Sequence, residues 1–253
     1  MSMTLESLPA TSRIMSYGEY QLLGYKGLDF EWHMRVLASY AKLLSSEVFG
    51  MVREDAAREV MFNMSNSGSI IIATVRDTGE AVAYSTQRIL EPVVDGSRIR
   101  VMYTSTRAVK CEHEGKGVGP ATLQYAFSMH DAPDILGGRT GMAPVVELYS
   151  KSGLIAEGKL YPFDRPYGES RAMQEVLKYV ASQTREKHPI NENTGLMEEV
   201  YDKDSDQVYD PEKASSRVQA IRERMIIEFG LRPMRGDAMI VLGVKRGWTR
   251  FVD

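Results

Sequence analysis

The sequence predicts a mixed α/β fold: an antiparallel meander followed by a parallel β-α-β part in one twisted sheet, flanked by helices, with a helical insertion near the C-terminus. Two patterns carry this prediction. Runs rich in β-branched residues are joined by the turn sequences Asp77–Glu80 and Asp95–Ser97, as in a meander. From Gly115 onwards, strand-like and helix-like segments alternate, which favours parallel pairing. The chain has 253 residues, 43% of them hydrophobic, so it can bury a core without disulfides or a metal.

The N-terminal part is predicted to contain one strand, Tyr20–Tyr25, followed by helices. Asp29 is a suitable N-cap for a helix to about Phe49, because apolar residues recur there at helical spacing and Gly50 follows as a stop. A second helix is expected over Glu54–Met64. The three meander strands are predicted at Ser69–Arg76, Ala81–Val94 and Arg98–Cys111.

The alternating part is predicted to contain, in order, a helix, a strand, a short helix and a strand, at Pro120–Met129, Ile135–Met142, Pro144–Ser152 and Leu154–Phe163. The final strand, Ala238–Val244, is expected to pair with Leu154–Phe163. We therefore expect a single domain over residues 1–253, with a core of residues 18–163 plus a final strand over 237–247.

The intervening residues 164–236 are predicted to form a helical insertion near the substrate side or at a subunit interface, which leaves a homodimer open. A separate C-terminal subdomain is the alternative. A helix is expected over Arg171–Thr184, and Asp210-Pro211 is a strong start signal for another. Between them, residues 186–210 are acidic and loop-like. They are interpreted as a solvated loop, or alternatively as a surface that attracts a cationic amine.

Composition excludes several classes of protein. The net charge of −3 argues against a nucleic-acid binder, which usually has a basic footprint. The only cysteine, Cys111, can form no internal disulfide and offers no zinc motif, so no metal is expected and a cytoplasmic location is favoured. Apolar stretches such as Ser69–Val75 are far shorter than the ~20 residues of a membrane span, so no membrane partner is expected.

The segment with the clearest chemistry is Val109–Leu123, VKCEHEGKGVGPATL. A strand leads into three glycines at alternate positions, and a helix follows at once. Glycines allow tight turns and close approach of a ligand, while the free N–H groups and the dipole of a helix start favour an anion. The segment fits neither the Walker A pattern nor the dinucleotide fingerprint. It nevertheless predicts a site for a phosphorylated ligand.

This loop resembles the coenzyme A pyrophosphate loop of the GCN5-related N-acetyltransferases (GNAT), whose pattern is Arg/Gln-x-x-Gly-x-Gly/Ala. Gly117 and Gly119 take the glycine positions, and Glu114 stands where the family has Arg or Gln. A second block, Met142–Leu154, is similar to the family's later helix, with Tyr149 at the position of its tyrosine. The resemblance covers about residues 20–163.

The resemblance implies that the chain transfers an acyl group, most simply acetyl from acetyl-CoA, to a small-molecule, peptide or protein amine by direct attack in a ternary complex. It implies Tyr149 as the general acid for the departing thiolate. Backbone groups of the preceding strand would bind pantetheine, and an N–H near Val109 would stabilise the oxyanion. The implied CoA-binding residues are Ala108, Val109, Cys111, Glu114, Gly115, Lys116, Gly117, Val118, Gly119 and Pro120.

The general base stays open, because Val101 falls where the family often has an acid on the third meander strand. The candidates are Glu91, Tyr103, Glu112 and His113, or a chain of water molecules. Lys116 is expected to offset the charge of Glu114, and Cys111 is expected to be a small strand residue and not a nucleophile. Two other functions stay open: a catalytically inactive CoA-binding regulator, and a transferase of longer acyl chains.

Overall fold

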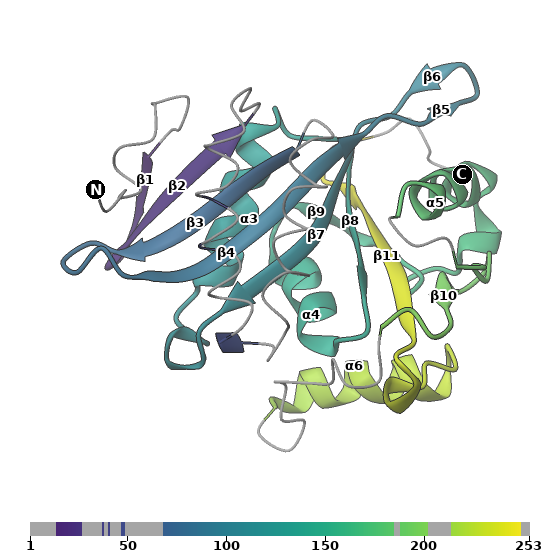
Figure 1. Ribbon diagram of the computed structural model, residues 1–253. Coiled ribbons are helices and arrows are strands. Elements are labelled where there is room, and N and C mark those ends of the chain that lie inside the picture. Colours follow the sequence, from purple (N-terminus) through teal and green to yellow (C-terminus); the bar gives the residue numbers. More distant parts are fainter. Residues whose placement is uncertain are drawn as a thin grey trace. The chain divides into compact units, whose positions relative to one another are not determined.

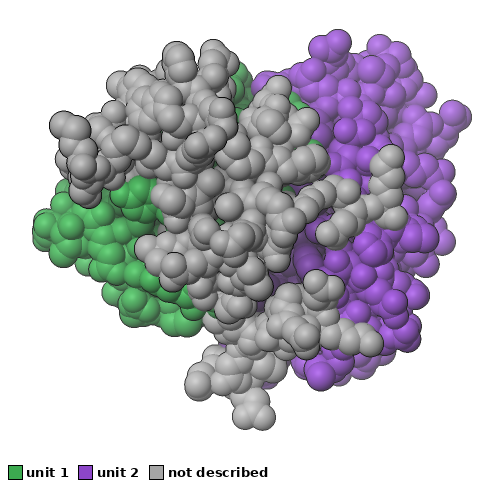
Figure 2. Space-filling model, in the orientation of Figure 1, with its two compact units in different colours: residues 1–89, 104–132 green, residues 90–103, 133–253 purple. Residues whose placement is uncertain are grey.

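The computed structural model describes residues 14–26, 37, 40, 47–48, 68–184, 188–201 and 214–248. The chain divides into two compact units, coloured separately in Figure 2. Unit 1 takes residues 1–89 and 104–132, and unit 2 takes residues 90–103 and 133–253. Strand β7 (Val101–Val109) starts in unit 2 and ends in unit 1. The single domain over residues 1–253 stays a prediction.

Unit 1 is built on a sheet in the order β1-β2-β3-β4-β7 (Figure 1). Its other strands are β1 (Ile14–Tyr17), β2 (Tyr20–Lys26), β3 (Gly68–Val75) and β4 (Ala81–Leu90). The pairs from β1 to β4 are antiparallel. The amide of Lys110 donates to the carbonyl of Val82, and Thr106 faces Thr86, so β7 runs antiparallel to β4 as well. The predicted meander is confirmed, and β1 is an additional strand.

Helix α3 (Val118–Met129) packs against β2 and β3. Buried polar groups connect its C-terminal end to the sheet. The Ser69 hydroxyl donates to Oε1 of Gln87 at 2.8 Å, and its oxygen lies 2.8 Å from Nε2 of His130, the C-cap residue of α3. All three residues are fully buried. Because buried polar groups are costly unless they are hydrogen-bonded, this network fixes the end of the helix on the sheet.

Three details of the predicted meander and its flanks differ. The strand expected over residues 81–94 stops at Leu90, because Pro92 has no N–H for the ladder. The next residues form a separate hairpin of β5 (Val93–Val94) and β6 (Ser97–Arg98). Cys111 is not a strand residue: β7 ends at Val109, and Cys111 begins the 3-10 turn η2 (Cys111–His113).

Within the predicted first helix, the described positions 37, 40, 47 and 48 are helical, whereas the expected helix over residues 54–64 lies outside the described residues.

Unit 2 contains β8 (Ile135–Thr140), β9 (Ile155–Tyr161), β10 (Leu196–Met197) and β11 (Ala238–Lys245). The predicted pairing of the final strand with β9 is confirmed, but β11 also pairs with β8, and both pairs are antiparallel. Strands β8 and β9 therefore run in the same direction on either side of β11 without direct pairing. Direct parallel pairing joins β8 to the start of β7, where the amide of Ile135 donates to the carbonyl of Arg100.

The insertion belongs to the core of unit 2. Helices α4 (Ala143–Lys151) and α6 (Ser216–Ile227) pack on each other, while α5 (Arg171–Ser182) packs on β11. Apolar residues of α5 and β10 join those of β11 in one buried cluster, including Met173, Val176, Leu177, Val180, Met197, Ile240 and Leu242. The insertion also supplies β10 to the sheet, so it is not purely helical. Helix α6 begins at Ser216 with Ser215 as its N-cap, whereas Asp210-Pro211 lies outside the described residues.

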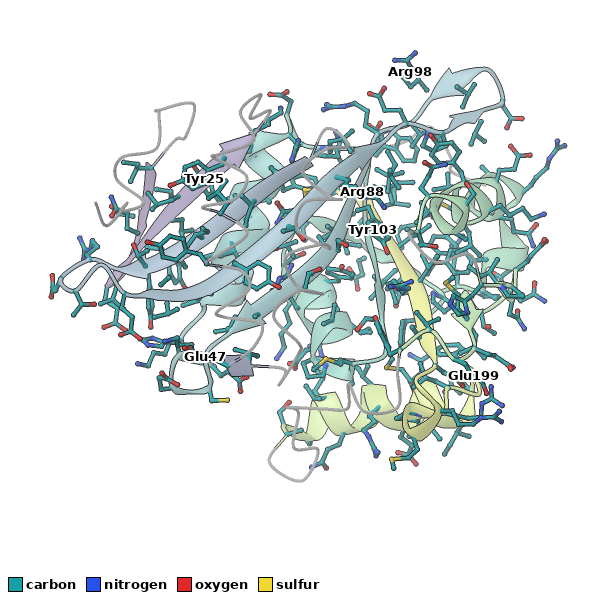
Figure 3. All side chains as sticks on the ribbon, viewed as in Figure 1. Tyr25, Glu47, Arg88, Arg98, Tyr103 and Glu199 are labelled. Carbon is teal, nitrogen blue, oxygen red and sulfur yellow. The ribbon has the colours of Figure 1, made fainter. Side chains whose placement is uncertain are left out.

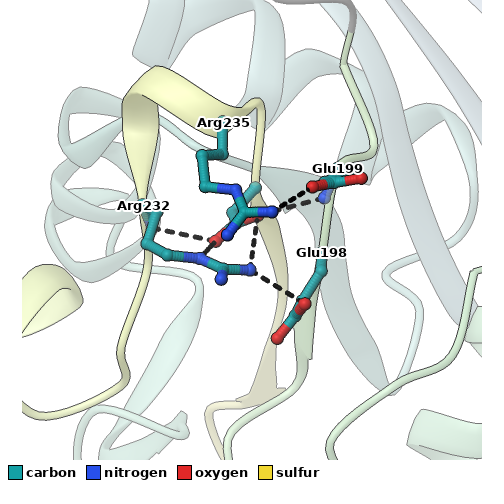
Figure 4. A network of polar contacts seen from close by, with 5 residues as sticks. Glu198, Glu199, Arg232 and Arg235 are labelled. Carbon is teal, nitrogen blue, oxygen red and sulfur yellow. Dashed lines mark hydrogen bonds and ion pairs between the residues drawn. The ribbon is translucent and has the colours of Figure 1, made fainter.

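A polar network closes the turn before β11 (Figure 4). The buried carboxylate of Asp237 accepts hydrogen bonds from the amides of Glu199 and Arg232, both at 3.0 Å, and from Nε of Arg232 at 2.7 Å. Arg232 also pairs with Glu198 at 2.9 Å, and Arg235 pairs with Glu199. Burial alone would raise the pKa of Asp237, but these hydrogen bonds and the charge of Arg232 hold it below its ordinary value. The network fastens residues 198–201 to the start of β11.

Candidate functional site

The glycine loop, residues 110–119, leaves the sheet at a fixed point. Besides the hydrogen bond from its amide to Val82, Lys110 places its Nζ 2.8 Å from Glu80 and 3.1 Å from Glu47, which is labelled in Figure 3. The hydrogen bond with Glu80 is the main reason that the pKa of Lys110 is raised, so this lysine stays charged. The predicted strand residues Ala108 and Val109 lie on β7, directly before this anchor.

Two tight turns follow the anchor. In η2, the amide of His113 donates to the Lys110 carbonyl at 2.9 Å, and the amide of Glu114 donates to the Cys111 carbonyl at 3.2 Å. Gly115 and Gly117 then have φ angles of 74° and 80°. Residues other than glycine rarely adopt φ angles in this left-handed region, which explains the glycine at both positions.

Gly117 is the N-cap of α3, and nothing on the helix itself neutralises its N-terminus. The cap makes no side-chain hydrogen bond, and the first turn contains no acidic residue. The amides of Val118 and Gly119 point out of the first turn and have no intrahelical acceptor, whereas Pro120 has no N–H to offer. A β-carbon on Gly119 would meet no atom within 4 Å, so the space beside this residue is open within the described part of the chain. This arrangement suits an anion that approaches the backbone closely.

The charged side chains of the loop do not pair with each other. Lys116 was expected to offset Glu114, but its Nζ lies 3.7 Å from Glu19 instead. Partial desolvation raises the pKa of the Glu114 carboxyl, although the residue as a whole is exposed. A raised pKa makes this carboxyl easier to protonate, which lessens its repulsion of a bound anion.

Tyr149 lies in unit 2, near the C-terminal end of α4, and is fully buried. The helix ends just after it, where the Ser152 hydroxyl donates to the Tyr149 carbonyl at 2.8 Å and Gly153 has a φ of 71°. Pro144 in the first turn and glycine after the end are the usual signals for a short helix, which the sequence carries at both ends. The role of Tyr149 stays a prediction.

The four candidates for the general base have different surroundings. Glu91 pairs with Arg98 at 3.1 Å and lies 4.0 Å from Arg100. Tyr103 is buried in the core of unit 2, and Glu112 is exposed. His113 is half-buried and places Nδ1 2.9 Å from the Tyr20 hydroxyl.

The sequence prediction missed the turn between β1 and β2, which contacts the loop through Tyr17, Glu19 and Tyr20. The available signal is the pair Gly18-Glu19 between two tyrosines, a two-residue hairpin turn with glycine first.

Among the described residues, no group of three or more His, Cys, Asp or Glu side chains could hold a metal ion. None of the described helices combines the length and hydropathy needed to cross a membrane.

No protein-family model matches the sequence, and no curated protein matches it. Solved structures are distantly similar. A protein from Desulfovibrio desulfuricans assigned to the GNAT family of acetyltransferases is 19% identical over 57% of this chain and 91% of its own, with a TM-score of 0.38. The ribosomal-protein-alanine N-acetyltransferase of Brucella melitensis biovar Abortus is 18% identical over 55% of this chain and 93% of its own, with a TM-score of 0.40. An aminoglycoside N-acetyltransferase in complex with CoA is 11% identical over 56% of this chain and 87% of its own, with a TM-score of 0.39.

Proposed function

We propose that the chain is an acyl-CoA-dependent N-acyltransferase of the cytoplasm that transfers acetyl from acetyl-CoA to a primary amine of a small molecule, peptide or protein. The observation that carries the proposal is the start of α3. Two left-handed glycines, an uncapped first turn and open space beside Gly119 follow directly on β7. This geometry fits the pyrophosphate of CoA, and the sequence motif over the same residues resembles a CoA loop.

Acyl-CoA would supply an acyl group activated as a thioester. The amides of the loop would hold the pyrophosphate, and backbone groups of Ala108 and Val109 would orient the pantetheine arm. The acceptor amine would attack the thioester carbon, and an N–H near Val109 would stabilise the resulting oxyanion. When the carbon–sulfur bond breaks, Tyr149 would give its proton to the sulfur. The nitrogen would lose one proton to a candidate base or to a chain of water molecules, and Tyr149 would regain a proton from solvent. The products are then an amide and free CoA.

The first test is calorimetric titration with acetyl-CoA of the wild-type protein and of Gly119→Glu. An acidic side chain in the first turn of a helix stabilises that helix, but it would repel a pyrophosphate. We therefore expect unchanged or slightly raised thermal stability together with lost acetyl-CoA binding. Ala220→Glu, which adds the same charge at an exposed position of α6, is the matched control and should bind like the wild type. Absence of binding to the wild type would refute the proposal.

Tyr149→Phe separates an enzyme from a CoA-binding regulator. For an enzyme, turnover of an amine acceptor should fall by about 10²- to 10⁴-fold, the usual contribution of a general acid, while acetyl-CoA binding is retained. A wild-type protein that binds acetyl-CoA but acetylates no amine in a broad panel would favour the regulator. Longer acyl donors in the same assay test the remaining alternative.

A further inference from the structure

The turn between β1 and β2 touches the glycine loop at three places. Tyr17 and Tyr20 face each other across the two-residue turn Gly18-Glu19. At the first place, a β-carbon on Gly117 would lie 2.3 Å from the Tyr17 hydroxyl oxygen, so this oxygen packs directly against the glycine that caps α3. Gly117 is thus required both by its φ angle and by its neighbour.

The second place is the side chain of His113. Its ring meets that of Tyr20 edge to face with 5.6 Å between centroids, and Nδ1 lies 2.9 Å from the Tyr20 hydroxyl oxygen. The same hydroxyl is the main reason that the pKa of the neighbouring Glu19 carboxyl is lowered. Burial and Glu19 raise the pKa of Tyr20 to about 12, so the hydroxyl keeps its proton.

The third place is the ion pair between Glu19 and Lys116 at 3.7 Å. Glu19 and its neighbour Tyr20 therefore contact the loop at two separate residues, Lys116 and His113. The turn itself is held by Arg76, the residue directly after β3. Its amide donates to the Glu19 carbonyl at 3.0 Å, and its guanidinium donates to the Gly18 carbonyl. The contacts thus connect the loop to a strand that is buried in the sheet.

We propose that Tyr17, Glu19 and Tyr20 are positioning residues that hold the glycine loop in shape for the phosphate-bearing end of CoA. The inference rests on the proposed function for its ligand. Its physical reason is the flexibility of the loop: glycines lose more conformational freedom on ordering than other residues, and a loop ordered before binding avoids that loss when the ligand arrives. The turn orders the loop on both sides of Gly115, at His113 and at Lys116 and Gly117.

Tyr20→Phe is the test variant, since it keeps the ring and removes only the hydroxyl. Calorimetry with CoA and with pantetheine, which lacks the phosphates, separates the two ends of the ligand. We expect CoA binding to weaken about threefold to tenfold, as for one lost hydrogen bond, and pantetheine binding to stay within about twofold. Tyr179→Phe, on the surface of α5 in unit 2, is the matched control and should change neither. Equal weakening for both ligands, or no change in CoA binding, would overturn the inference.

Hydrogen exchange of the free protein tests the positioning without any ligand. In Tyr20→Phe, the amides of His113 and Glu114 should exchange faster, because the hydrogen bond that holds η2 in place is gone, while the amides of β3 should be unchanged. Faster exchange with no CoA binding by the wild type would refute the proposed function and its ligand but support the positioning role. Unchanged exchange would refute the positioning role alone.

Discussion

Two of the turns that are built around a left-handed glycine treat their polar groups in opposite ways. In unit 1, Gly117 (φ 80°) begins α3 and leaves the first-turn amides without a partner on the helix. In unit 2, Gly236 (φ 72°) precedes Asp237, whose buried carboxylate satisfies two backbone amides and one arginine (Figure 4). A turn whose donors meet internal acceptors is stabilised by its own contacts, whereas helix-start amides without an intrahelical acceptor suit a ligand.

The largest loss of stability is expected from breaking the turn at Gly236 and Asp237. Asp237→Ala removes the acceptor of the Glu199 and Arg232 amides, and unsatisfied buried donors cost about 1–3 kcal/mol each. Chemical denaturation should show a loss of about 2–4 kcal/mol in the free energy of unfolding. Asp237→Asn keeps an acceptor and should lose clearly less. Equal losses for the two variants would mean that the hydrogen bonds contribute little.

A smaller loss of stability is expected for Gly117→Ala, in the turn that begins α3. A left-handed conformation costs about 1–2 kcal/mol for a residue with a β-carbon, and the Tyr17 hydroxyl must move aside. Thermal unfolding should report this loss. Gly115→Ala has nearly the same φ, but no atom of the described residues lies within 4 Å of the new β-carbon. The difference between the two variants therefore measures the contact with Tyr17.

Gly119→Ala should raise the stability of the protein instead of lowering it. Gly119 lies in the first turn of α3, and no atom of the described residues would meet a β-carbon there. Alanine is favoured over glycine in a helix by about 0.5–1 kcal/mol. A small rise in the melting temperature is the expected result. A fall would show that the space beside Gly119 is needed for folding, contrary to a binding role.

The smallest effect on stability is expected at low pH, where the turn at Gly236 loses the charge of Asp237. The pKa of Asp237 lies below that of an unfolded aspartate, so its contribution is complete above the ordinary value and is lost as pH falls through the lower, folded value. Below pH 4, the stability of wild type should therefore fall more steeply than that of Asp237→Asn. Parallel pH profiles would contradict the assignment of an ionised Asp237.

What the sequence could predict follows from the range of the interactions involved. The conformation of residues 115–119 is local, because glycines set it, and the strands of the meander follow from β-branched runs such as Ile70–Ile72. The contacts of the loop are not local: Tyr20 and His113 are separated by 93 residues, and no pattern within either segment indicates the other. Lys116 was assigned to its neighbour Glu114 for the same reason, since sequence distance was the only guide to its partner.

The sheet of unit 2 was predictable only in part for a related reason. The buried run Ala238–Val244 identifies a strand, and its pairing with β9 was anticipated. Its second pairing, with β8, depends on where a long insertion returns the chain, which no local pattern encodes. The order of strands at this edge therefore required the structure.

The position of β11 between β8 and β9 also bears on how the protein is synthesised. The pair Ile135 and Val244 spans 109 residues (244 − 135), so β8 leaves the ribosome long before its partner exists. Closing so long a loop slows folding, and unpaired strand edges are exposed to aggregation until it closes. A nascent chain that ends before β11 would therefore hold β8 and β9 without the strand that joins them, and this is the stage at which chaperone binding should be strongest.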